Sequence, residues 1–72
     1  MSEQILREIL DPAGGNRVTI VRRSDGRFSY RRQEKRDGSW GPPTVDSGVY
    51  DSADTAEIEA RQRVPWLKAL FH

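Results

Sequence analysis

The chain has 72 residues, of which 35% are hydrophobic and 32% are charged, and its net charge is only +1. A domain of this size buries only about 60% of the surface of its unfolded chain, which argues against a deep catalytic pocket. The absence of cysteine excludes disulfides and thiolate metal sites. No apolar run approaches the roughly 18 residues of a membrane span and no secretory signal is recognisable, so we expect an intracellular, cytoplasmic protein.

The charges are grouped along the chain. Residues 17–36 carry eight basic and two acidic side chains, whereas residues 37–60 carry six acidic side chains and no basic one. A polyanion responds to the local field of a basic patch, while the whole protein sets only the long-range attraction. The basic segment therefore indicates a candidate anion-binding surface although the protein as a whole is nearly neutral.

The first segment, from Ser2 to Leu10, is predicted to be a short amphipathic helix followed by a linker through residue 16. Ile5, Leu6, Ile9 and Leu10 fall on one helical stripe, and Ser2 can cap it. Nine residues are too few for a helix that is stable alone in water, so the stripe must dock on the domain, on a second copy or on a partner. Ile5 and Ile9 are therefore candidate interaction residues, and self-association is the favoured role.

The next two elements are predicted to be strands, Arg17–Arg23 and Arg27–Lys35, joined across Ser24-Asp25-Gly26. A two-residue turn would mix charged and aromatic side chains on one face. A three-residue loop with Gly26 in the left-handed conformation instead pairs residue 22 with 28 and residue 20 with 30. We favour the three-residue loop because it gathers the apolar side chains on a single face; these are Val18, Ile20, Phe28 and Tyr30.

A third strand is expected within Thr44–Tyr50, after a turn at Asp37-Gly38. Pro42 and Pro43 cannot lie in a central strand, so this strand is placed at a sheet edge. If Val45 and Val49 face inward, Tyr50 points to the opposite face, and a bulge at Gly48 would reverse this. The face that Tyr50 occupies is left open.

The main helix is predicted to run from about Ser52 to Val64, with Ser52 or Asp54 as its cap. Its small apolar side chains recur on one face and allow close packing on the sheet; they are Ala53, Ala56, Ala60 and Val64. Pro65 ends this helix and starts a C-terminal turn or short second helix. The predicted fold class is α+β: a three-stranded antiparallel sheet packed by one main C-terminal helix. Residues 1–16 form the N-terminal helix and linker, and residues 17–72 form a single domain.

Residues suited to catalysis are nearly absent from the sequence. The only histidine is His72, there is no cysteine nucleophile, and no phosphate-binding glycine motif is present. The carboxylates belong to turns and to a helix surface. We therefore expect a protein that is not an enzyme and that needs no metal and no cofactor.

The most concentrated signal is an arginine face, which we define as Arg17, Arg23, Arg27 and Arg31. Strand alternation places these four side chains on the face opposite the apolar residues. A two-stranded ribbon of this kind fits a DNA major groove, where arginine binds phosphates or guanine edges. Antiparallel sheets also commonly leave one face solvated, and arginine suits that role. The solvated face is the favoured interpretation, with a nucleic-acid site as the alternative.

Three aromatic residues outside the strands are further candidates for binding a partner. Trp40 precedes two prolines, and Trp66 and Phe71 belong to an unusually apolar C-terminal segment. Exposed tryptophans can anchor a protein partner or stack on a nucleobase. For all three we favour the alternative that they close the core of a small domain.

The segment Gly48-Val49-Tyr50-Asp51-Ser52-Ala53-Asp54-Thr55-Ala56-Glu57-Ile58, after an Asp-Gly hairpin, resembles two kinds of small bacterial domain with three strands and a helix. One is the uncharacterised YegP-like family, which has a similar helix entry and implies no known activity. The other is the arm-DNA-binding domain of tyrosine recombinases, with the related plant AP2 domain, which places a sheet face in the DNA major groove. The resemblance covers about residues 17–62. The second likeness implies that the arginine face contacts DNA.

These observations predict a small non-catalytic domain that acts as an interaction module. Its partner is an unidentified protein or a second copy of the chain, and no membrane is involved. The alternative function is weakly specific nucleic-acid binding through the arginine face.

Overall fold

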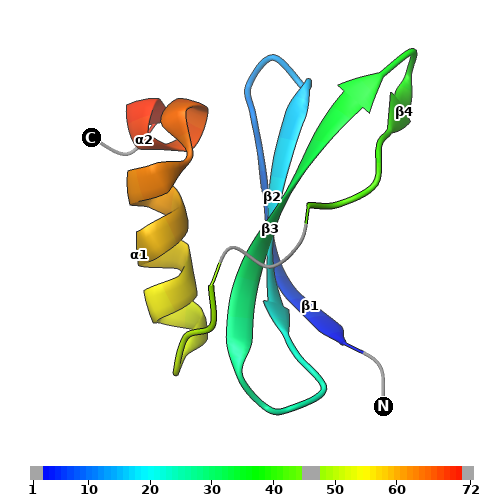
Figure 1. The fold of residues 1–72 in the computed structure, drawn as a ribbon. Helices are drawn as coiled ribbons and strands as arrows, with labels where there is room; N and C mark the ends of the chain where they lie inside the picture. Colours follow the sequence, from blue (N-terminus) through cyan, green and yellow to red (C-terminus); the bar gives the residue numbers. More distant parts are fainter. Residues whose placement is uncertain (1–2, 45–47, 71–72) are drawn as a thin grey trace.

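The computed structural model describes residues 3–44 and 48–70. A four-stranded antiparallel sheet with the strand order β1-β2-β3-β4 carries two C-terminal helices on one face (Figure 1). The elements are β1 (Gln4–Leu10), β2 (Asn16–Arg22), β3 (Phe28–Arg36), β4 (Ser39–Trp40), α1 (Ala53–Arg63) and α2 (Pro65–Leu70). The predicted α+β class with an antiparallel sheet is confirmed. The prediction of three strands and one main helix is wrong, because the described residues form four strands and two helices.

The predicted N-terminal helix is wrong, since Gln4–Leu10 form the edge strand β1. β1 pairs with β2 so that Ile9 lies opposite Val18 and Arg7 opposite Ile20, with an irregularity between Ile5 and Arg7. The predicted linker is the turn of this hairpin, in which Gly14 has a φ of +78°. A short helix cannot form all of its hydrogen bonds at its ends, whereas pairing with β2 satisfies most of the backbone groups on one edge of this segment.

The predicted register of the β2–β3 hairpin is confirmed. Arg22 pairs with Phe28, Ile20 with Tyr30 and Val18 with Arg32. Gly26 closes the three-residue loop with a φ of +84°, a conformation that costs a side chain with a Cβ atom about 1–2 kcal/mol. This register brings the apolar side chains of both strands to the face that carries the helices, which we call the helix face.

The predicted third strand at Thr44–Tyr50 is wrong in its position. The next strand is the two-residue β4, which follows a tight turn at Asp37-Gly38, where both residues have the positive φ that a type I′ hairpin turn requires. Of the predicted segment, Thr44 donates its backbone N–H to Arg32 O at 2.9 Å, and Tyr50 forms an isolated bridge with Phe28. Val45 lies outside the described residues. The prolines prevent a longer strand because they lack backbone donors.

The face that Tyr50 occupies is decided by its ring contact. The Tyr50 ring stacks on Tyr30 with 6.3 Å between the ring centroids, and Tyr50 packs against the core cluster. Tyr50 therefore lies on the helix face. Burial raises the pKa of its hydroxyl above the ordinary value for tyrosine.

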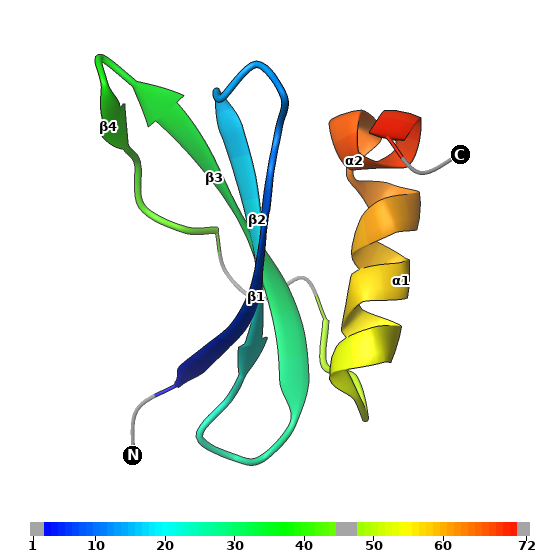
Figure 2. The same ribbon diagram turned by 180° about the vertical axis from the view of Figure 1, so that it is seen from behind.

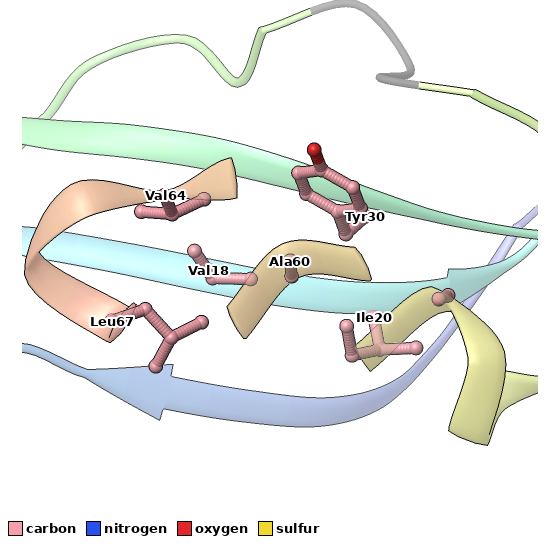
Figure 3. Close-up of a cluster of buried hydrophobic side chains, with 7 residues drawn as sticks. Val18, Ile20, Tyr30, Ala60, Val64 and Leu67 are labelled. Atoms are coloured by element: carbon pink, nitrogen blue, oxygen red, sulfur yellow. The ribbon is translucent and has the colours of Figure 1, made fainter. Parts of the chain in front are cut away.

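The core lies between the helix face and the helices (Figure 3). Ser52 caps α1 by accepting a hydrogen bond from Thr55 N–H at 3.1 Å, which settles the choice between the two predicted caps. The fully buried side chains of the cluster come from β2, α1, α2 and the residue between the helices; they are Val18, Ile20, Ala56, Ala60, Val64 and Leu67, with Tyr30 nearly so. The segment that begins at Pro65 is the helix α2, and its buried Leu67 closes the core. Among the described helices, none is long and apolar enough to cross a membrane.

Candidate interaction surfaces

Arg17 of the arginine face is held by partners on three sides. Its guanidinium donates to Gln33 Oε1 from Nε at 2.9 Å and to Glu8 Oε2 at 3.1 Å. The same guanidinium lies over the Trp40 ring, 4.4 Å from the ring centroid. These contacts satisfy the planar donor fork of the side chain and add a cation–π interaction. Arg17 is therefore a structural residue in this conformation.

Two more members of the arginine face are paired with carboxylates. Arg31 forms a two-pronged ion pair with Glu3, and Arg23 lies 3.3 Å from a carboxylate oxygen of Asp25. Arg27 is exposed, and among the described residues its guanidinium has no partner. The structure thus brings Arg17 and Arg31 together around one region of the sheet but neutralises both. The acids that do this, Glu3 and Glu8, come from the N-terminal segment that was predicted to be helical.

The sequence pattern predicted that the sheet face carrying these arginines is solvated. In the structure, the residues between the arginines on that face are buried instead. Thr19 is 5% exposed, Val21 2% and Ser29 0%. Thr19 and Val21 lie at an open cavity of about 430 Å³ whose rim includes Ile5 and Pro43. Long side chains from the neighbouring strands shield this region, since arginine and glutamine stems cover apolar surface while their polar ends reach water. The Ser29 hydroxyl has no hydrogen-bond partner among the described residues.

The two tryptophans have different environments. Trp40 lies on β4 between Arg17 and Lys35, whose Nζ is 5.8 Å from the ring centroid, and it is not among the side chains packed on the core. The expectation that Trp40 plugs the core is therefore wrong. Trp66 on α2 packs partly against the core, as expected, and also lines a second cavity. Phe71 lies outside the described residues.

The edge strand β1 carries the largest group of exposed apolar side chains in one element. Ile5 is 65% exposed, Leu6 38% and Leu10 51%, whereas Ile9 is half-buried against the core. Ile5 was a predicted interaction residue and remains exposed; Ile9 contributes to packing instead. In the view from behind, β1 lies in front of β2 and none of the other described elements runs along its outer side (Figure 2).

Arg7 joins this edge strand to α1 on the helix face. Its guanidinium donates to Asp54 Oδ1 at 2.8 Å and to Glu57 Oε1 at 2.9 Å. These two hydrogen bonds, with that to Asp54 the larger cause, raise the pKa of Arg7 above its ordinary value. These contacts with α1 therefore hold β1 in place, although among the described strands only β2 forms backbone hydrogen bonds with it.

A cavity of about 500 Å³ lies near the far end of β3. It is lined by side chains and backbone from β2, β3, the segment after β4 and α2: Asn16, Arg32, Gln33, Glu34, Arg36, Gly41, Pro42, Thr44 and Trp66. Strand alternation places Arg32 at the end of the apolar face but does not connect it with Trp66. Only the position of α2 brings the two segments together, so no local pattern could have shown this site.

Comparisons with models of protein families, with curated proteins and with solved structures find no match for this chain.

Proposed function

We propose that the protein is a non-catalytic interaction module that binds an extended segment of a protein partner along the outer edge of β1. The observation that carries this proposal is the exposure of Ile5, Leu6 and Leu10 on an edge strand that, among the described strands, pairs with β2 alone. An edge strand presents unpaired backbone donors and acceptors, and a partner strand can satisfy them by extending the sheet.

The size of the edge supports this mode of binding. Seven residues in β1 span about 23 Å at roughly 3.3 Å per residue, which is long enough to pair with a peptide of similar length. The pairing with β2 places Ile5 and Leu10 on the arginine face and Arg7 on the helix face. A bound strand would therefore meet the apolar side chains of Ile5 and Leu10, with Glu8 between them, on one face and the charged group around Arg7 on the other. Apolar residues at alternate positions of the partner suit the first face.

Nucleic-acid binding through the arginine face is the weaker proposal. A phosphate would have to replace the carboxylates that already hold Arg17 and Arg31, and each exchange exposes an acid next to the incoming anion. Within the arginine face, Arg27 is the one member that is exposed without a partner among the described residues. One such cation gives little affinity, because nucleic-acid binding depends on the number of phosphates neutralised.

The proposal can be tested by placing a photo-crosslinking phenylalanine derivative at Leu6 or Leu10 in host cells. Val49 is the matched control, since it is 45% exposed and apolar but belongs to the segment after β4. We expect discrete adducts from positions 6 and 10 and none from position 49. Leu6→Lys should remove the adduct formed from position 10.

The mass of the adduct identifies the partner. An adduct of twice the chain mass indicates a second copy, which sedimentation of the purified protein over a range of concentrations would verify. Equal labelling from all three positions, or no labelling from positions 6 and 10, overturns the proposal.

A further inference from the structure

The cavity at the far end of β3 combines cationic, aromatic and hydrogen-bonding groups in one place. β3 and β4 bend away from the helices at this end of the sheet, and α2 lies at the same end of the molecule (Figure 1). Arg32, Glu34 and Arg36 are alternate residues of β3, so they share the face that carries the helices. Trp66 of α2 completes the lining. The volume of about 500 Å³ falls in the range of sites for small organic ligands.

Arg32 is the cation that the fold leaves available. Arg32 is an exposed residue, and its guanidinium has no hydrogen bond or ion pair among the described residues. Its backbone is nevertheless fixed, because Arg32 N–H donates to Thr44 Oγ1 at 3.1 Å and Thr44 N–H donates to Arg32 O at 2.9 Å. A free charged group on a fixed backbone is suited to bind an anion with little ordering of the chain.

Arg36 is a second available cation, on the same face of β3 as Arg32 and four residues further along the strand. Its one ion pair among the described residues joins it to Glu34 at 3.3 Å, with the Arg36 side chain 80% exposed and that of Glu34 62% exposed. Pairs this exposed contribute little and exchange readily with a competing anion. Glu34 would then remain as a carboxylate within the cavity, which disfavours a bare anion and favours a ligand that also offers a hydrogen-bond donor.

Trp66 supplies a flat apolar surface held by its neighbours. The adjacent side chain of Leu67 is fully buried, as is Val64 just before α2, and Trp66 itself packs partly on the core. The remaining part of the Trp66 side chain lines the cavity together with Pro42. A fixed indole of this kind is a stacking platform for a planar ring.

We infer that this cavity binds a nucleobase together with its phosphate, either as a free nucleotide or as part of a single strand. The base stacks on Trp66, the phosphate binds Arg32 and Arg36, and Glu34 accepts a hydrogen bond from the amino group of the base. Adenine and cytosine, which carry such an amino group, bind better than thymine. This inference does not depend on the proposed role of β1.

The experiment follows the fluorescence of Trp66 in a Trp40→Phe background, where it is the remaining tryptophan of the two in the chain. The probes are AMP, an oligo(dA) and an oligo(dT) strand of equal length, and inorganic phosphate, all at low salt. We expect saturable quenching by the adenine ligands, weaker quenching by oligo(dT) and none by phosphate. The double variant Arg32→Gln, Arg36→Gln should weaken adenine binding by about tenfold or more.

The matched control is Arg22→Gln with Arg27→Gln, which removes the same charge from two other exposed arginines. The affinity of this control variant for the adenine ligands should stay within about twofold of that of the parent, because only the long-range electrostatic attraction of the phosphate changes. The NMR chemical shifts of the backbone amides and the indole N–H of the unsubstituted protein provide a measurement that does not depend on any variant. On addition of AMP, the signals of Arg32 and Trp66 should move and that of Thr19 should stay fixed.

The probes also distinguish the two sources of the ligand. Equal affinity for AMP and oligo(dA) indicates a free nucleotide, and tighter binding of oligo(dA) indicates a single strand. The inference is overturned if neither adenine ligand quenches Trp66 at millimolar concentration. It is also overturned if both double variants lose affinity equally.

Discussion

Arg7 of the edge strand donates a hydrogen bond to Asp54 in the first turn of α1, with 2.8 Å between the nitrogen and the oxygen. The two residues are 47 positions apart in the sequence. Asp54 also lies where the helix dipole favours an acid, so one carboxylate stabilises the helix start and anchors the edge of the sheet. Glu57 adds a second contact from the same helix.

Arg7→Gln should therefore loosen β1 without unfolding the domain. The β1 amides, and the β2 amides that point to β1, should exchange with solvent faster, while the amides of β3 and the β2 amides that point to β3 keep their protection, because the core cluster is untouched. Hydrogen exchange followed by NMR measures the difference. Arg7→Glu combined with Asp54→Arg should restore part of the protection, and Arg36→Gln should leave β1 unchanged. Uniform loss of protection in all strands would contradict the prediction.

Leu67→Ala should lower the free energy of unfolding by about 2–5 kcal/mol, because it opens a cavity beneath α2 at a fully buried position. Leu70→Ala, at a residue of the same helix that is 43% exposed, should change stability by less than about 0.5 kcal/mol. Urea denaturation of both variants provides the comparison. Equally small losses of stability in the two variants would mean that α2 is not part of the core.

Gly26→Ala should cost about 1–2 kcal/mol of stability because the φ of +84° at this position is unfavourable for alanine. A methyl group at Gly26 would meet no atom within 4 Å beyond the adjacent residues, so the cost is purely conformational. Gly15→Ala is the control, since Gly15 also has free space but no positive φ. Thermal unfolding monitored by circular dichroism should show a clear decrease for the first variant only.

Ser29→Ala should raise the free energy of unfolding by about 1 kcal/mol. The hydroxyl is fully buried and has no partner among the described residues, so removing it relieves a desolvation cost. Ser39→Ala, at an exposed position of β4, should be neutral within about 0.5 kcal/mol. Destabilisation by Ser29→Ala would show instead that the hydroxyl is hydrogen-bonded in solution.

Asp11→Asn should alter the dependence of stability on pH. The carboxylate accepts hydrogen bonds from the side chain of Asn16 and from Ala13 N–H, and these lower its pKa. A lowered pKa in the folded state stabilises the fold above the ordinary aspartate pKa of about 3.9, and this contribution is lost as pH falls through the folded-state value. The difference between parent and variant should thus be present at neutral pH and vanish in acid. A constant difference across this range would exclude a contribution from the Asp11 charge.

The structure could be predicted best from the sequence where the local pattern allowed only one arrangement of the residues. The β2–β3 register follows from placing Val18, Ile20 and Tyr30 on one face, and only the three-residue loop with Gly26 allows this. The paired side chains of α1 were also predictable, since Glu57 with Arg61 and Glu59 with Arg63 are four residues apart on one helix.

The errors arose where two patterns fit the same residues. The apolar side chains of Gln4–Leu10 satisfy a helical stripe, and their strand conformation is determined by pairing with β2, which local periodicity does not reveal. The same error concealed the carboxylates of Glu3 and Glu8 beside Arg31 and Arg17. For the candidate sites, the sequence named Trp66 and Ile5 as candidates but could not place Trp66 and Arg32 at one cavity, because they line it together only through the tertiary position of α2.

The order of the elements has a consequence for how the chain is made. The strands are complete before either helix has been synthesised, and Leu70 at the end of α2 follows Trp40 at the end of β4 by 30 residues. At about 5–20 residues per second, the ribosome needs about 1.5–6 s to add the helices that cover the sheet. A message truncated after β4 would therefore release a chain with an uncovered apolar surface, which chaperones and proteases recognise.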